Sequence, residues 1–272
     1  MRNSVKKGVL FLLCSGLMLV AGRCDKKDPV SPDTRDKEQE EIADSAETNV
    51  IYGGVRSSSY GIAPFPSRAQ WIAAMDSMAA FFPGSTPSAL WIVGVMGDSR
   101  TCHLEFPSGG GEYDNITFSA QDKHEQFLTA FDQAGIEVFL QVESADAHVG
   151  TLIDIVLSRY GHHPCVAGFG VDAEWYRVSE RPGWGVKVAD DSARVWEKRV
   201  KAHDPDYRLF LKHWDRRWMP PTYRGDLIFV DDSQGFNDFQ AMLDEFCDYW
   251  SDYFKPATVF FQYGYERDKR WW

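Results

Sequence analysis

The sequence predicts an α/β fold, a TIM-type (β/α)8 barrel occupying residues 50–272. Three observations lead to this prediction. Short apolar runs alternate with longer amphipathic runs, an arrangement typical of parallel strands joined by helices. The strand candidates end in polar side chains, as expected at the ligand-binding face of such a barrel. No dinucleotide-binding glycine fingerprint follows the first strand candidate, and no stretch rich in Pro, Gly or Ser divides the domain.

The individual elements follow from apolar periodicity and from turn residues. Strands are expected at Val50–Val55, Ala89–Met96, Ile136–Glu143, Val166–Trp175, Arg208–Trp214, Leu227–Asp232 and Thr258–Tyr265. Helices are expected at Ser67–Phe82, Ala120–Ala134, Val149–Tyr160, Asp190–Ala202 and Phe236–Phe254. Ser67 and Ser119 are suited to N-caps, and Gly135 and Gly161 to helix ends.

Two features depart from a regular eightfold repeat. Residues 215–225 join the fifth and sixth strand candidates, contain Pro220 and Pro221, and leave no room for a full helix. The chain ends at Trp271-Trp272, soon after the seventh strand candidate. We therefore expect a barrel that is incomplete at its C-terminus, because the sequence is a fragment. The alternative is a barrel closed with fewer strands.

Residues 1–24 predict a signal peptide. Basic residues precede an apolar run, Gly8–Gly22, that is short for a membrane span. The small residues Val20-Ala21-Gly22 suit ordinary signal cleavage. Alternatively, residues 19–24 resemble a lipobox, in which Cys24 becomes the lipidated first residue of a bacterial lipoprotein, although Arg23 departs from its usual small residue. The lipoprotein is favoured because a tether-like stretch follows, so the predicted location is extracytoplasmic, at the bacterial cell surface or outer membrane. Without the lipid, the protein is expected to be secreted or periplasmic.

Residues 25–49 are polar, acidic and nearly free of large apolar side chains, which predicts a disordered linker. Loss of residues 1–24 lowers the basic count from 29 to 25 against 40 acidic residues, a formal charge of −15. This charge argues against nucleic acid or an anionic lipid surface as a partner. Membrane contact is expected only through the lipid anchor. The cysteines show no CxxC spacing, and neither a metal nor a cofactor is predicted.

The fourth strand candidate carries the most informative residues. In an alternating strand, Asp172 and Glu174 share one face with Gly170, at the end where parallel barrels bind ligands. Glycoside hydrolysis needs one protonated carboxylic acid and a second group that supplies negative charge or a nucleophile. Electrostatic coupling between the two acids is expected to raise the pKa of Glu174.

Other strand candidates also end in polar groups, and these predict a functional cleft because burying them without a task is costly. The substrate-binding candidates are Gln141, Glu143, Lys212, His213, Asp215, Asp231, Gln262 and Tyr265. Aromatic residues follow the same strands, and Trp175 and Trp214 are predicted to stack on sugar rings, whose C–H faces are apolar. The second carboxylate is Glu143, Asp231 or Glu266 if the substrate lacks an acetamido group.

The segment Gly168-Phe169-Gly170-Val171-Asp172-Ala173-Glu174 resembles the fourth-strand signature of chitinase-like glycoside hydrolases and endo-β-N-acetylglucosaminidases. That signature is Asp-Gly-x-Asp-x-Asp-x-Glu on a (β/α)8 barrel. Gly168, Asp172 and Glu174 match its glycine, last aspartate and glutamate, whereas Ala167 and Gly170 replace the two earlier aspartates. The resemblance implies that Glu174 is the general acid and that Asp172 orients the substrate's nucleophilic acetamido group. A short Asp-x-Glu also resembles muramidase-type barrels.

The rival interpretations differ in class. Metal hydrolysis is disfavoured because no paired histidine spacing organises the possible ligands. A serine hydrolase is disfavoured because no GxSxG elbow is present. The main alternative to a glycoside hydrolase is a surface-tethered barrel that binds a glycan without cleaving it. In both cases the expected partner is a carbohydrate.

Overall fold

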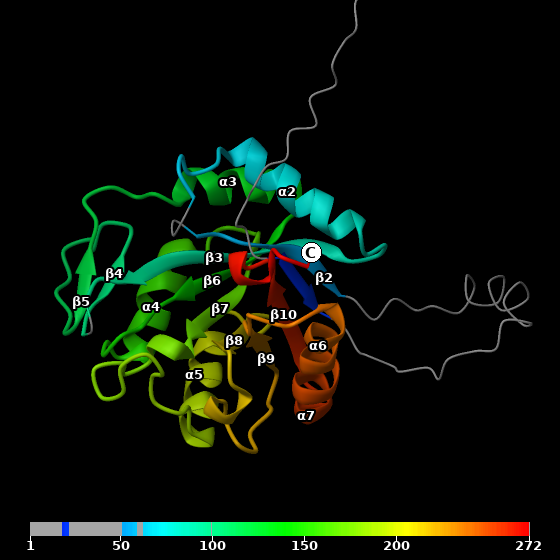
Figure 1. Ribbon diagram of the computed structural model, residues 1–272. Helices are drawn as coiled ribbons and strands as arrows, with labels where there is room; N and C mark the ends of the chain where they lie inside the picture. The colour runs from blue at the N-terminus through cyan, green and yellow to red at the C-terminus, as the bar shows by residue number, and fades with distance from the viewer. Residues whose placement is uncertain (1–17, 22–50, 59–61, 99, 272) are drawn as a thin grey trace, which may run out of the picture.

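The computed structural model describes residues 18–21, 51–58, 62–98 and 100–271 (Figure 1). Its strands form one sheet in the order β2-β1-β10-β9-β8-β7-β6-β3-β4-β5. The strands are β1 Met18–Ala21, β2 Tyr52–Arg56, β3 Thr86–Met96, β4 Cys102–Leu104, β5 Ile116–Phe118, β6 Glu137–Val142, β7 Val166–Asp172, β8 Arg208–His213, β9 Leu227–Asp231 and β10 Thr258–Tyr263. The main helices are α2 Arg68–Ala80, α3 Glu125–Ala134, α4 Val149–Tyr160 and α5 Asp190–His203.

The parallel part of the sheet confirms the seven predicted strands. Neighbouring strands pair in parallel throughout the series β2, β3, β6, β7, β8, β9 and β10. Helices intervene between β2 and β3, β3 and β6, β6 and β7, β7 and β8, and β9 and β10. The β8–β9 connection holds only a short 3-10 turn, Arg216–Trp218, as the proline pair predicted. The fold is therefore α/β, with a mostly parallel sheet.

The predicted (β/α)8 barrel is not confirmed. β1 lies between β10 and β2 and is antiparallel to both, so no described parallel strand joins the ends of the series. This short strand belongs to the predicted signal peptide, while Cys24 and the predicted linker lie outside the described residues. No described helix is long and apolar enough to cross a membrane.

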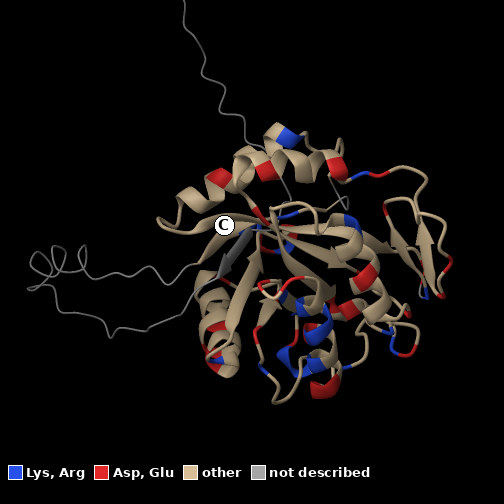
Figure 2. Ribbon diagram, turned by 180° about the vertical axis from the view of Figure 1, so that it is seen from behind, with Lys and Arg blue, Asp and Glu red and all other residues tan. Residues whose placement is uncertain are grey.

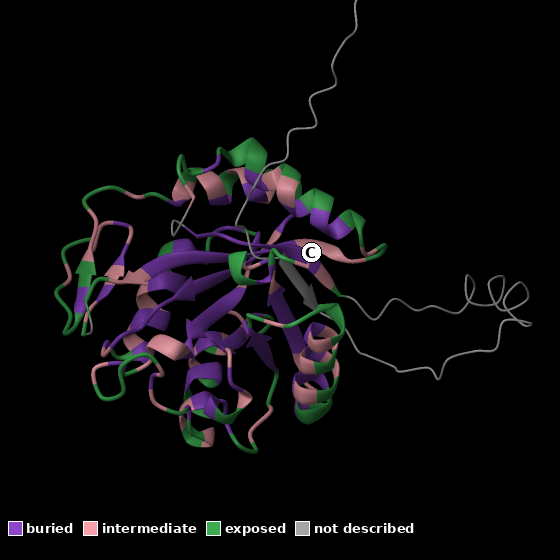
Figure 3. Cartoon of the chain, viewed as in Figure 1, coloured by how far each residue is buried: buried purple, intermediate pink, exposed green. Residues whose placement is uncertain are grey.

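The two faces of the sheet have different neighbours. One face carries a small apolar cluster of Leu90, Phe139, Phe210, Ile228, Val230 and Phe260. The opposite face packs against the helices, as where Trp91 lies edge-on to Trp71 of α2 and to Phe131 of α3. Figure 3 shows the resulting buried strands beneath helices whose outer sides are exposed. Because side chains alternate along a strand, the small cluster defines which residues share its face.

Polar side chains follow this cluster by two residues on several strands. Gln141 follows Phe139, Lys212 follows Phe210, and Gln262 follows Phe260. All three polar residues are buried. A polar layer thus lies next to the apolar one, towards the carboxyl ends of the parallel strands.

Local sequence explains most helix ends. Ser67 caps α2 in a capping box with Gln70, and Gly135 ends α3 with a left-handed backbone, φ 69°. α3 begins at Glu125 rather than near Ala120, because Asp122 accepts the backbone N–H groups of His124 and Glu125. The last predicted helix is α6 Phe239–Asp244, a π-helical turn Glu245–Ser251 and α7 Asp252–Phe254. The sequence reading did not predict β4 and β5.

Candidate functional site

A pocket of about 550 Å³ opens at the carboxyl ends of the parallel strands. Its lining is strongly charged and includes two large aromatic side chains. The described residues that line the pocket are Arg56, Ser58, Glu143, Asp172, Glu174, Trp175, Lys212, Asp232, Gln234, Gly264, Tyr265, Glu266 and Arg267. Of the predicted site residues, the pocket brings together both catalytic candidates with Glu143, Lys212, Tyr265, Trp175 and Glu266. Figure 2 shows acidic and basic positions meeting among the strands.

Asp172 lies at the end of β7 in the centre of a network of opposite charges. Its Oδ2 is 2.8 Å from Nζ of Lys212 and 3.6 Å from a guanidinium nitrogen of Arg56. Gln141 donates to the same oxygen through Nε2 at 3.3 Å, and accepts from Nε of Arg56 at 3.0 Å. The other carboxylate oxygen of Asp172, Oδ1, is buried without a hydrogen-bond partner among the described residues. Buried polar atoms are usually hydrogen-bonded, so this oxygen is an exception within the network.

Lys212 joins two carboxylates from adjacent strands. Its ammonium is ion-paired with Asp232 as well as with Asp172. Burial by itself would lower the pKa of Lys212, but Asp172 and Asp232 raise it, so Lys212 carries a positive charge at neutral pH. Asp232 Oδ1 is likewise buried and has no hydrogen-bond partner within the described ranges.

Glu174 lies two residues beyond the end of β7. β7 ends at Asp172, and Ala173–Trp175 form a 3-10 turn, so the strand predicted to reach Trp175 stops earlier. The turn still directs Glu174 into the pocket. Burial, followed by repulsion from Asp172, raises the pKa of Glu174 to about 7, against an opposing effect of Lys212. Glu174 is thus protonated in a substantial fraction of molecules at neutral pH, as a general acid requires.

Three acids of the pocket converge. Asp172, Glu174 and Asp232 each offer a carboxylate oxygen, and these oxygens lie within 4.8 Å of one another. Such a group could hold a cation, but the Lys212 ammonium already contacts two of its members. The negative charge of the cluster is therefore partly neutralised by Lys212. Glu174 is the one acid of the three that makes no ion pair with Lys212 among the described residues.

Glu143 follows β6 and belongs to the same charged network. It accepts the backbone N–H of Met96 at 2.8 Å and lies 3.9 Å from Arg56. Burial, with a further contribution from Asp172, raises its pKa. Gln262 is fully buried and donates to the hydroxyl of Tyr265 beside the pocket, so its role is to position Tyr265.

Six predicted ligand-binding residues are not part of the described pocket lining. Gln141 and Gln262 contact lining residues, whereas the other four, Asp231, His213, Trp214 and Asp215, lie elsewhere. Asp231, like Leu227 and Phe229, lies on the face of β9 that packs against the helices, and it accepts the backbone N–H of Ser233. Burial raises its pKa well above the usual value. Asp232, one residue later, is the acid that enters the pocket. The prediction of Asp231 as a ligand-binding residue is therefore replaced by Asp232, because adjacent strand residues face opposite ways.

His213, Trp214 and Asp215 form a separate aromatic region outside the pocket lining. The backbone N–H of Asp215 donates to Nδ1 of His213, so Nε2 carries the proton and donates to the carbonyl of Trp184. Trp214 packs on Trp184 with ring centroids 4.3 Å apart. Asp215 pairs with Arg217, an exposed neighbour. These contacts shape the β8–β9 connection.

Sequence reasoning did not select Arg56 and Asp232 as site residues. Both stand next to a predicted strand end, which was the available signal. Arg56 is the last residue of β2. Its guanidinium reaches the acids of the pocket because the fold places β2 near β6 and β7, which the sequence does not show. Its buried guanidinium then partly balances the acids of the neighbouring strands.

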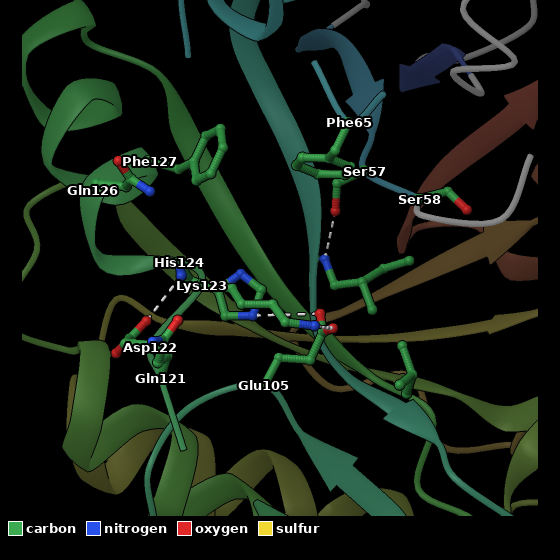
Figure 4. A pocket seen from close by; sticks show the side chains of 12 residues that line it. Ser57, Ser58, Phe65, Glu105, Gln121, Asp122, Lys123, His124, Gln126 and Phe127 are labelled. Atoms are coloured by element: carbon green, nitrogen blue, oxygen red, sulfur yellow. Dashed lines mark hydrogen bonds and ion pairs between the residues drawn. The ribbon is translucent and has the colours of Figure 1, made fainter. Parts of the chain in front are cut away.

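A smaller pocket of about 370 Å³ adjoins the charged one, since Ser58 lines both. Figure 4 shows Phe65 and Phe127 on its walls, with Glu105 and His124 close to Lys123. Trp91 donates its indole N–H to Nδ1 of His124 at 3.1 Å, so the proton of the neutral imidazole is on Nε2. Burial lowers the pKa of His124 to about 4, so the ring is neutral at pH 7. The pocket therefore combines the apolar walls of Phe65 and Phe127 with the neutral His124 ring as a donor and the Glu105 carboxylate as an acceptor.

Comparisons with protein-family models, with curated proteins and with solved structures found no match to this chain.

Proposed function

We propose that this protein is a glycoside hydrolase with Glu174 as the general acid. The observation that carries the proposal is the position of Glu174: its pKa is raised to about 7, and it shares a pocket with Asp172 and Asp232. Glycosidases pair one protonated carboxylic acid with a second carboxylate across the bond that breaks. Trp175 and Tyr265 in the lining offer surfaces on which a sugar ring can stack.

The second component is negative charge held next to the reacting carbon. Asp172 is fixed by Lys212, Arg56 and Gln141, so its carboxylate is anchored through Oδ2, while Oδ1 is buried without a hydrogen-bond partner among the described residues. An anchored anion can orient an acetamido group or stabilise the positive charge that develops on the sugar in the transition state. The resemblance of residues 168–174 to the chitinase-like signature favours an N-acetylated glycan.

The spacing of the acids favours retention of anomeric configuration. One carboxylate oxygen from each acid lies within 4.8 Å of one oxygen from each of the others, an approach that is compatible with the roughly 5–5.5 Å carboxyl separation of retaining enzymes. Proton NMR of the first product formed should show the substrate's anomer, and an inverted product would exclude this arrangement.

The proposal includes the architecture and location. The seven parallel strands and the ligand pocket at their carboxyl ends support a (β/α)8-type barrel, with one position between β10 and β2 not filled by a parallel strand. The N-terminal sequence supports export and attachment through a lipid on Cys24.

Turnover is tested by measuring reducing ends released from chitin oligomers, N-glycans and peptidoglycan. The wild type should cleave at least one class, and Glu174→Gln should lower kcat by roughly 10²–10⁴-fold while binding persists. Glu112→Gln, on the exposed surface, is the matched control. Binding of a glycan by both proteins with turnover in neither would replace this proposal with a non-catalytic glycan-binding protein.

A further inference from the structure

A second cluster of ligating side chains lies outside the charged pocket. Glu125, at the start of α3, meets His162 and His163 from the connection between α4 and β7. One ligand atom from each residue falls within a group whose members are all within 4.8 Å of one another. None of the three residues belongs to the described lining of the charged pocket.

Hydrogen bonds determine which nitrogen of each histidine faces the cluster. His162 Nδ1 lies 3.0 Å from the carbonyl oxygen of Arg159, and His163 Nδ1 lies 2.7 Å from Oδ2 of Asp132. Both partners are acceptors, so both Nδ1 atoms carry protons. In the neutral rings, each Nε2 therefore presents a lone pair towards Glu125.

This arrangement brings three electron-pair donors together without a hydrogen between them. Glu125 Oε1 is 3.4 Å from Nε2 of His163 and 3.5 Å from Nε2 of His162. His163 is buried, with its side chain 4% exposed, and its Nε2 has no hydrogen-bond partner among the described residues. The two imidazole rings also lie against each other, with centroids 4.1 Å apart. A bound cation satisfies all three donors at once.

The distances agree with a tetrahedral zinc ion. Zinc bonds of about 2.0–2.1 Å to nitrogen and oxygen place neighbouring ligand atoms about 3.3–3.4 Å apart. The two measured separations from Glu125 are 3.4 and 3.5 Å. Asp132 and the Arg159 carbonyl supply the outer partners that orient metal-binding histidines. His162 and Glu125 are 59% and 46% exposed at their side chains, so solvent can reach the ion and supply its fourth ligand.

We propose that Glu125, His162 and His163 bind a divalent transition-metal ion, Zn²⁺ by their ligand set and geometry. Imidazole nitrogens select such metals over Mg²⁺ and Ca²⁺, which prefer oxygen ligands. The ion connects the first turn of α3 to the segment that leads into β7. Its role is structural, because binding to the folded state stabilises that state. The sequence contains His162 and His163 as possible metal ligands, but it does not show that Glu125, far away in the chain, lies beside them.

The test uses the full chain after removal of metal with EDTA. Isothermal titration with Zn²⁺ should show one ion bound per chain, and Zn²⁺ should raise the thermal midpoint. His162→Ala and Glu125→Gln change exposed side chains, so they should fold while binding Zn²⁺ at least tenfold more weakly. Asp132→Asn should weaken binding by roughly 10–100-fold, as expected for an outer partner of a histidine ligand.

Two controls locate the bound ion. His103→Ala removes a histidine that hydrogen-bonds Thr117 and Ser119, away from the proposed ligands, and should bind Zn²⁺ like the wild type. Asp172→Asn reports on the acids of the charged pocket. Equal binding by the wild type, His162→Ala and Glu125→Gln would overturn the proposal, as would a loss of binding confined to Asp172→Asn. None of these measurements depends on glycan turnover, so this inference and the proposed function fail separately.

Discussion

At the scale of the single residue, the raised pKa of Glu174 has a consequence for stability as well as for the proposed catalysis. The ordinary value is 4.5 and the folded value is about 7, so between these values the folded state keeps a proton that the unfolded state loses. The free energy of unfolding therefore falls as pH rises through this window. Glu174→Gln cannot lose a proton, and its stability relative to the wild type should rise by up to about 3 kcal/mol between pH 4.5 and 7.

Urea denaturation at pH 4.5 and pH 8 measures this difference directly. Titrations of groups that do not interact with Glu174 are common to both proteins and cancel in the comparison. Glu112→Gln controls for removal of one surface charge. A difference between wild type and Glu174→Gln that is the same at both pH values would show that Glu174 does not hold its proton in the folded state.

Lys212 illustrates how a buried cation keeps an acidic pocket folded. It is 2% exposed and pairs with Asp172 and Asp232. Lys212→Met retains much of the side-chain volume but leaves two nearby buried carboxylates without their common partner. Breaking a buried ion pair in this way costs about 3–5 kcal/mol. Chemical denaturation at pH 7 should show that loss, whereas Lys198→Met, an exposed position on α5, should lie within about 0.5 kcal/mol of wild type. A similarly small effect at Lys212 would contradict the ion-pair network.

At the scale of the element, the contact between β7 and β8 explains the departure from the chitinase-like signature. A Cβ added to Gly170 would lie 2.0 Å from the Phe210 ring, so this ring occupies the space that a side chain there would need. The aspartate that the resembling family keeps at this position is excluded by packing. Asp172 instead obtains its partners from β2, β6 and β8, through Arg56, Gln141 and Lys212.

A double-mutant cycle tests this packing. Gly170→Ala should destabilise by about 1–3 kcal/mol, the usual cost of overpacking, and Phe210→Ala by about 3–5 kcal/mol. In the double variant the new methyl group enters the space left by the ring, so the combined loss should be at least 1 kcal/mol smaller than the sum. Additive losses in equilibrium denaturation would show that the two positions do not compete for space.

The same elements show what the sequence could and could not predict. Seven parallel strands were predictable because each is a short apolar run followed by a polar end. Which end residue faces the pocket was not predictable for β9, because Leu227, Ile228, Phe229 and Val230 are all buried and show no polar alternation. The choice between Asp231 and Asp232 therefore depended on packing. β4 and β5 were missed because each is only three residues long.

At the scale of the whole molecule, residues 18–21 belong both to the sheet and to the signal peptide that the sequence predicts to be cleaved off. β1 pairs with β10 and β2, yet cleavage after residue 22 or 23 would remove it from the mature protein. The six parallel pairings that connect β2 through β3 and β6–β9 to β10 do not involve β1. The charged pocket also draws its described lining from residues 56–267.

We therefore expect the chain to fold and function without its first residues. A protein comprising residues 25–272 should unfold cooperatively in urea and retain the far-UV circular dichroism and the proposed glycan turnover of the full chain, because the pairings that position Asp172, Lys212 and Asp232 remain. Intact-mass analysis of exported protein should find a first residue at Arg23, or at Cys24 carrying a lipid that Cys24→Ala removes. A mature protein that retains residues 18–21, together with loss of cooperative unfolding in the 25–272 protein, would show instead that β1 is a permanent part of the sheet.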